Sequence, residues 1–305
     1  MKDFYHISFS SHDEVMFRSR EDHAMFVNML ALHSFNDDTG IVADSEMSTH
    51  AHLEAITSHP LRFTAKLKMS YYRWFNHKYG RSGPLGEEGS FVLRLDGINH
   101  KMVATSYILR NGLHHGASSS AFGYEFCSIK EMFQTDIGFE VPRTAIIDHN
   151  DIARLLPRRS RFPDNWRMDE SGMILRRDFM EIPIAESFYG TPRNFLFQMN
   201  RITDEKIVEE QLKDNTDDPI TLLQIENASE TSLTEFLRNE SGRNFSKSKM
   251  QDLDVCSLID NELIVPYGVS SVYRLSQSQK QQLARLLKYD FHISDKQISR
   301  CLPGL

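Results

Sequence analysis

The spacing of apolar residues divides the first 111 residues into short strands and longer amphipathic helices. Residues 4–9 alternate as in a strand, and we expect three further strands over residues 41–45, 51–57 and 90–95. Apolar positions recur at helical spacing over residues 19–34, 61–79 and 99–111. This order of elements predicts an α+β fold, in which an antiparallel sheet is flanked by helices.

Local start and stop signals agree with these boundaries. Ser19 lies three residues before Asp22, which fits an N-terminal helix cap. Pro60 suits the first turn of the second helix, where its missing N–H has no cost. Gly80 and Gly112 follow the second and third helices, and we expect those helices to end there.

After residue 120 the pattern becomes shorter and more mixed. We expect short helices over residues 128–133 and 150–156, a hairpin over 161–179 and an acidic helix over 204–212. Ser276 and Ser294 cap two final helices, over residues 277–289 and 295–302. The chain is therefore predicted to contain a first domain (1–120), a mixed helical and hairpin extension (121–215) and a mostly helical C-terminal region (216–305).

The two final helices have the pattern of a helix-turn-helix over residues 276–302. In that interpretation the second helix would present four polar residues to DNA: Lys296, Gln297, Ser299 and Arg300. The same pattern also fits a two-helix cap packed through Leu283, Leu286, Leu287 and Ile298. The sequence leaves both interpretations open.

Composition restricts the class of protein. Hydrophobic residues make up 40% of the chain and charged residues 25%, which is typical of a globular protein and excludes a wholly disordered one. No apolar run approaches the roughly 18 residues of a membrane span. Cys127, Cys256 and Cys301 are too far apart for a disulfide framework or a CxxC zinc site. We therefore expect a cytoplasmic protein with no membrane partner.

Charge is unevenly distributed, although the net charge is only −7. Residues 59–86 contain basic residues and no acidic one, whereas residues 204–262 carry an excess of acidic residues. A basic stripe of this kind can be a polyanion site or simply a solvated helix face. Its members, the candidate DNA-binding residues, are Arg62, Lys66, Lys68, Arg73, Lys78 and Arg81.

Candidate chemistry begins with His50 and His52, which are separated by Ala51. Residues two apart in a strand lie on the same face, so the two imidazoles can converge on one divalent metal ion. Tyr107 and Asn111 are four apart, which would place a phenol and an amide on one face of a helix. Each pair alone also fits ordinary packing of polar or aromatic residues.

Taken together in this order, the motifs resemble the single-tyrosine HUH transposases, and in particular the REP-associated tyrosine transposases. The resemblance rests on Tyr5-His6-Ile7-Ser8, the run from Met47 to Leu53, the helix end from Tyr71 to Gly83, and the run from Tyr107 to Asn111. It implies an HUH endonuclease domain with a ferredoxin-like fold over residues 1–120. It also implies that Tyr107 is the nucleophile and that His50, His52 and Asn111 are the metal ligands.

The resemblance implies a function as well. The protein would cleave single-stranded or hairpin DNA with Mg²⁺ or Mn²⁺, form a 5′-phosphotyrosine, and transfer the strand. It would act as a monomer or as a homodimer. The sequence departs from the family at Ala51, usually a bulky residue, and at Gly112, usually proline; the loop that includes Glu87 and Glu88 is acidic where relatives are aromatic and basic.

Three rival functions remain open at this point. A rolling-circle initiator or relaxase would share the metal site, but these proteins usually have two catalytic tyrosines or a helicase region. A relative without catalytic activity would bind DNA hairpins and act as a regulatory protein. An unrelated metallohydrolase would use water as the nucleophile and leave no protein-linked product.

Overall fold

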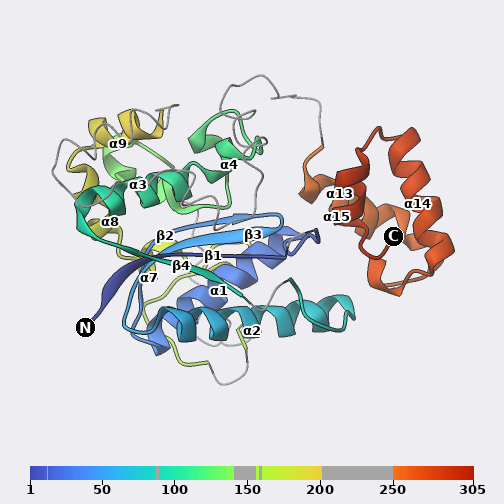
Figure 1. The fold of residues 1–305 in the computed structure, drawn as a ribbon, viewed down its shortest axis with the longest axis horizontal. Helices are drawn as coiled ribbons and strands as arrows, with labels where there is room; N and C mark the ends of the chain where they lie inside the picture. Colours follow the sequence, from blue (N-terminus) through green and yellow to red (C-terminus); the bar gives the residue numbers. More distant parts are fainter. Residues whose placement is uncertain (12, 87–88, 141–155, 158–159, 201–249) are drawn as a thin grey trace.

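The computed structural model describes residues 1–11, 13–86, 89–140, 156–157, 160–200 and 250–305 (Figure 1). The predicted helix over residues 204–212, and all but the last residue of that over 150–156, lie outside these ranges. The predicted boundary between residues 215 and 216 also lies outside them.

A four-stranded antiparallel sheet forms the centre of the fold. Its strands are β1 (Asp3–Ser10), β2 (Gly40–Met47), β3 (His50–Thr57) and β4 (Phe91–Leu95), in the order β2-β3-β1-β4. With α1 (Arg20–Asn36) after β1 and α2 (Pro60–Tyr79) after β3, the topology is the βαββαβ of ferredoxin-like folds. The α+β prediction is therefore confirmed.

Helices α1 and α2 cover one face of the sheet (Figure 1). Ser19 forms the predicted capping box with Asp22, and Gly80 ends α2 in the left-handed conformation (φ 61°), which glycine adopts without strain. Alternate residues of the strands pack on these helices to form an apolar core. Its members include Leu53, Phe26, Leu30, Phe63, Leu67 and Tyr71, all at most 1% exposed.

The opposite face of the sheet is covered by a second layer (Figure 1). This layer contains α3 (Gly97–Leu109), α4 (Asn111–His114), α8 (Ile182–Tyr189) and α9 (Pro192–Met199). The predicted single helix over residues 99–111 is therefore wrong in two respects. Helix α3 begins two residues earlier, and it ends at Leu109; Arg110 (φ −93°, ψ 3°) follows as its cap, and Asn111 starts α4.

Gly112 lies inside α4 and does not end a helix, contrary to the prediction. A Cβ atom at this position would lie 2.3 Å from Cγ of Tyr124, closer than real contacts allow. Gly112 therefore permits the ring of Tyr124 to pack directly against the α4 backbone.

The extension after residue 120 consists of short elements. They are η1 (Ala121–Gly123), η2 (Ser128–Glu131), α5 (Gln134–Ile137) and α7 (Arg176–Phe179). The predicted hairpin is limited to an antiparallel bridge between Met168 and Ile174, because residues 176–179 are helical instead.

Residues 250–305 form a C-terminal module at one end of the sheet (Figure 1). Its elements are α13 (Asp252–Leu258), η3 (Ile259–Leu263), η4 (Val265–Tyr267), η5 (Val272–Arg274), α14 (Gln277–Tyr289) and α15 (Asp295–Cys301). The two predicted final helices are confirmed as α14 and α15. They share an apolar core that includes Leu283, Leu287 and Ile298, as expected for a two-helix cap.

Helix α15 does not present all its polar residues to solvent. Gln297 is 3% exposed and donates a hydrogen bond to the Met250 carbonyl (2.8 Å), so its predicted exposure is wrong. Arg300 is bonded to Asp252 of α13. The described contacts of α15 are thus those of a packed helix.

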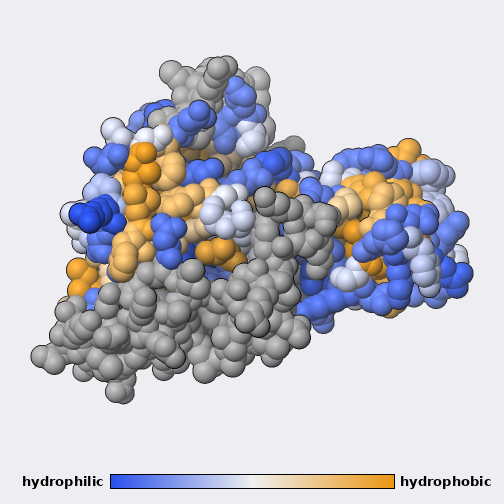
Figure 2. Space-filling model, turned by 90° about the horizontal axis from the view of Figure 1, so that it is seen from above, coloured by the Kyte–Doolittle hydropathy of each residue, from blue (hydrophilic) through white to orange (hydrophobic). Residues whose placement is uncertain are grey.

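Figure 2 views the layer of α3, α4, α8 and α9 from above and shows hydrophobic residues gathered at the end away from the C-terminal module. Large exposed apolar side chains of this layer include Ile98 and Phe197. Among the described residues, no helix has both the length and the apolar character needed to cross a membrane.

Candidate functional site

The two predicted histidine ligands lie next to each other on β3, on the face covered by α3 and α4. His50 is 5% exposed and His52 is fully buried. Their ring centroids are 5.1 Å apart and the rings are nearly perpendicular. Strand alternation thus brings the imidazoles to one side of the sheet, as predicted.

Tyr107 of α3 lies against these histidines. Its ring centroid is 5.3 Å from that of His52, in an edge-to-face arrangement (81°). The ring of His114, on α4, stacks on the Tyr107 ring, with centroids 5.3 Å apart and 20° between the ring planes. Tyr107 is only 1% exposed, so the phenol is enclosed between β3 and α4.

Asn111, the remaining predicted ligand, lies in an element that the sequence did not anticipate. It is the first residue of α4, so Tyr107 and Asn111 do not share one continuous helix. Its side chain is fully buried, and neither its amide nitrogen nor its oxygen has a hydrogen-bond partner among the described residues. Such a buried amide has an energetic cost unless a ligand uses it.

His6 of β1 forms a buried hydrogen bond with His52, between Nε2 of His6 and Nδ1 of His52 (3.0 Å). The two rings are parallel within 5°, with centroids 5.2 Å apart. Burial lowers the pKa of His6 to about 3, and burial together with the neighbouring His50 lowers the pKa of His52. Both rings are therefore neutral, as metal ligation by histidine requires.

Glu54 follows on the same face of β3. It is fully buried, and the Thr105 hydroxyl of α3 donates to its Oε2 atom (2.5 Å). Burial is the main cause that raises the pKa of Glu54 to about 8. This contact fixes α3 to β3 only two residues from Tyr107.

His115 is a further neighbour, with its ring 4.7 Å from that of His50. The sequence interpretation assigned no role to His6, Glu54, His114 or His115. Two signals were available: Glu54 continues the alternation of His50 and His52, and His114 lies three residues after Asn111. The neighbourhood of His6 depends on strand pairing, which no local pattern shows.

The side chains of His50, His52 and Asn111 are two imidazoles and an amide, which are of a kind that can bind a divalent metal ion. Within the described ranges, no three His, Cys, Asp or Glu side chains are arranged to hold a metal ion. Nε2 of His52 and Oδ1 of Asn111 are nevertheless buried and lack a protein partner among the described residues. These two atoms are of the kinds that the predicted ligand set requires.

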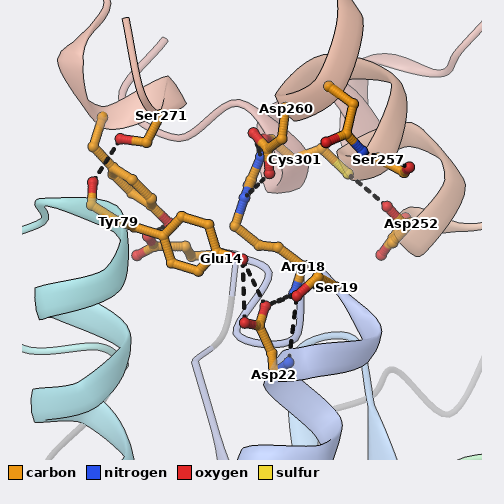
Figure 3. A network of polar contacts seen from close by, with 12 residues as sticks. Glu14, Arg18, Ser19, Asp22, Tyr79, Asp252, Ser257, Asp260, Ser271 and Cys301 are labelled. Atoms are coloured by element: carbon orange, nitrogen blue, oxygen red, sulfur yellow. Dashed lines mark hydrogen bonds and ion pairs between the residues drawn. The ribbon is translucent and has the colours of Figure 1, made fainter. Parts of the chain in front are cut away.

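The C-terminal module is tied to the segments that enter this site. Arg18, fully buried in the loop before α1, forms a bidentate ion pair with Asp260 and donates to the Cys301 carbonyl (Figure 3). The Ser48 hydroxyl, two residues before His50, donates to Asp252 (2.7 Å). The turn that leads into the histidines is therefore held by α13.

The basic stripe is divided into two groups by the structure. Four of the six predicted DNA-binding residues have internal partners: Lys66 pairs with Asp37, Lys68 donates to the Gly89 carbonyl, Lys78 pairs with Glu21 and Asp22, and Arg81 pairs with Glu14. Arg62 and Arg73 are exposed and form no ion pair within the described residues. Within the described part of the chain, Arg62 and Arg73 are therefore the exposed members of the stripe.

The sequence matches none of the protein-family models and none of the curated proteins with which it was compared. A solved structure of a REP-associated tyrosine transposase bound to a REP hairpin is similar to part of the chain. The similarity covers 46% of this chain and 82% of that one, at 14% identity and a TM-score of 0.36. These values indicate a distant structural relationship.

Proposed function

We propose that this protein is a DNA strand transferase that cleaves single-stranded DNA through a 5′-phosphotyrosine on Tyr107, at hairpin-forming repeats. The observation that carries the proposal is the contact of Tyr107 with His52, the proposed nucleophile with a proposed metal ligand. The match of sequence motifs supports the choice of tyrosine over water as nucleophile.

In the cleavage step, the Tyr107 oxygen attacks the phosphorus of the scissile phosphodiester. The bond from phosphorus to the 3′ oxygen breaks as the tyrosine ester forms. The phenol loses one proton and the departing 3′ oxygen gains one. The ester preserves the bond energy, so a second 3′-hydroxyl can attack it and reseal a strand without ATP.

His50, His52 and Asn111 would hold the divalent ion, which we propose to be Mg²⁺ or Mn²⁺. When bound, it would polarise a non-bridging oxygen of the scissile phosphate. The chain itself contributes orientation: the Thr105–Glu54 contact fixes α3, and the Asp252–Ser48 contact fixes the turn before His50.

Access to this site requires exposure of the Tyr107 phenol. The ring of His114, on α4, stacks on that of Tyr107, and Tyr107 and Asn111 are almost fully buried. We therefore expect α4 to move when a phosphodiester reaches the phenol. This enclosure also favours a second candidate function, a hairpin-binding protein that does not cut DNA.

Cleavage of labelled single-stranded DNA, with analysis of the protein-linked product, tests the proposal. Tyr107→Phe retains the ring and its packing, so binding should persist while cleavage and the covalent adduct disappear together. Tyr72→Phe, on α2, is the matched control and should retain both.

Three other outcomes contradict parts of the proposal. An adduct on another tyrosine overturns the assignment of Tyr107. Cleavage with no protein-linked product, even after rapid quenching, favours the metallohydrolase. Tight hairpin binding with no cleavage under Mg²⁺ or Mn²⁺ favours the binding protein.

A further inference from the structure

The hydrogen bond between His6 and His52 determines which atom of His52 can bind a metal ion. It joins Nε2 of His6 to Nδ1 of His52 (3.0 Å), and both side chains are fully buried. A hydrogen bond between two ring nitrogens contains one proton, which is carried by one ring and accepted by the other. The structure therefore allows two arrangements, with opposite consequences.

If His52 carries the proton on Nδ1, its Nε2 atom has a free lone pair. If His6 carries the shared proton, a neutral His52 has its own proton on Nε2 and cannot ligate through that atom. Nε2 of His52 is the buried nitrogen without a protein partner among the described residues, next to Tyr107. Only the first arrangement makes this nitrogen a ligand.

The proposed function, on which this inference rests, selects the first arrangement. With the shared proton on His52, a neutral His6 carries its own proton on Nδ1, which needs an acceptor. Glu54 lies directly opposite His6 in the pairing of β1 with β3, so the two side chains share a face of the sheet. Nδ1 of His6 and Oε1 of Glu54 are both buried, and neither has a partner in the described part of the chain.

The second arrangement is incompatible with the proposed metal site. It would place an N–H on Nε2 of His52, the atom that the proposed function assigns to the metal ion.

We propose that His6 is a positioning residue that holds His52 in the Nδ1–H tautomer, so that Nε2 is available to the metal ion of the proposed function. His6 accepts from His52, and Glu54 lies opposite His6 in the strand pairing. Loss of such an outer-sphere partner typically weakens metal binding by about tenfold to a hundredfold.

Titration of the full-length protein with Mn²⁺ alone, followed by electron paramagnetic resonance, measures this effect without DNA. His6→Leu removes the acceptor and should raise the Mn²⁺ dissociation constant by about tenfold to a hundredfold. His6→Gln keeps an acceptor oxygen near the position of Nε2 and should recover most of the affinity. His23→Leu, which replaces a buried imidazole of α1, is the matched control and should bind Mn²⁺ as the wild type does.

Nitrogen-15 NMR of the metal-free wild type provides a second readout that requires no variant to fold. The ring signals should show His52 protonated on Nδ1 and unprotonated on Nε2. Protonation of His52 on Nε2 would overturn the inference, as would wild-type Mn²⁺ affinity in His6→Leu. If the wild type binds neither Mn²⁺ nor Mg²⁺, the proposed function fails, and the NMR result still decides whether His6 sets the tautomer.

Discussion

The two faces of the sheet are built from alternate residues of the same strands, yet they differ in kind. On β3, Ala51, Leu53 and Ala55 pack into the apolar core with α1 and α2. His50, His52 and Glu54 lie between them in sequence and face α3 and α4. Both sets are buried, but only the second contains polar atoms without described partners.

Within the eight residues of β3, the residues that stabilise the fold alternate with the buried polar residues of the candidate site. Burial of an apolar side chain such as Leu53 stabilises the fold by about 1.5 to 3 kcal/mol. Each buried polar group without a partner costs about 1 to 3 kcal/mol. The polar face therefore lowers stability unless a ligand uses these groups, which is typical of functional sites.

The largest expected effect contrasts the two faces directly. Leu53→Ala should lower the free energy of unfolding by about 3 kcal/mol, because it removes buried methyl groups and leaves a cavity. His52→Ala should lower it by less, because the loss of its hydrogen bond with His6 is partly offset by the removal of a buried Nε2 atom that has no described partner. Urea unfolding of both variants measures this, and equal losses would show that the faces do not differ.

A smaller effect is expected from Glu54, whose pKa of about 8 lies well above its usual value near 4.3. The folded state retains a proton that the unfolded state releases, so stability falls as pH rises from about 4 through 8. Between pH 6 and pH 9 Glu54 should account for a loss of about 2 to 3 kcal/mol. Glu54→Gln should be free of this loss.

Urea unfolding of the wild type and Glu54→Gln across this pH range measures the difference between their stability profiles. Other groups titrate in both proteins and cancel in that difference. If the stability of both proteins changes with pH in the same way, the Glu54 carboxyl ionises normally in the folded state.

The smallest effect on stability is expected at the exposed surface of α2. Replacement of both Arg62 and Arg73 by Gln should change stability by less than about 0.5 kcal/mol. If they contact phosphates, it should also reduce the salt dependence of single-stranded DNA binding, by about 1.4 in the slope of log affinity against log salt.

Lys66 and Lys78, replaced together by Gln, are the matched control on the same helix. Their charges are shared with Asp37, Glu21 and Asp22, so stability should fall while the salt slope changes less. Filter binding at several salt concentrations compares the two double variants. If the salt slope changes equally in the two double variants, the whole basic stripe takes part in DNA binding.

Much of the fold follows from local pattern. The spacing of apolar residues predicts all four strands to within two residues, and Ser19, Gly80 and Ser276 mark helix ends correctly. These features depend on a few neighbouring residues. The same pattern fails at Arg110, which separates α3 from α4, and Gly112 of α4 packs closely against Tyr124. That contact joins residues distant in sequence.

The candidate site also has features that the local sequence predicts and features that depend on contacts between distant residues. Alternation places His50 and His52 on one face, but strand register alone brings His6 to His52. The basic stripe is visible in the sequence, whereas the acids that neutralise it come from Glu14, Glu21, Asp22 and Asp37. Gln297 is polar and yet buried, since Met250 supplies the partner that makes burial possible.

The contact between Tyr107 and His52 within one polypeptide has a consequence for genetics. In an assembly that exchanges the tyrosine helix, two different defective chains can restore one intact centre by complementation. In the proposed function, with this contact formed within one chain, each chain would contain both halves of its own centre. A mixture of His52→Ala and Tyr107→Phe chains should therefore remain inactive at any ratio, and a cell that expresses both alleles should show no recovery.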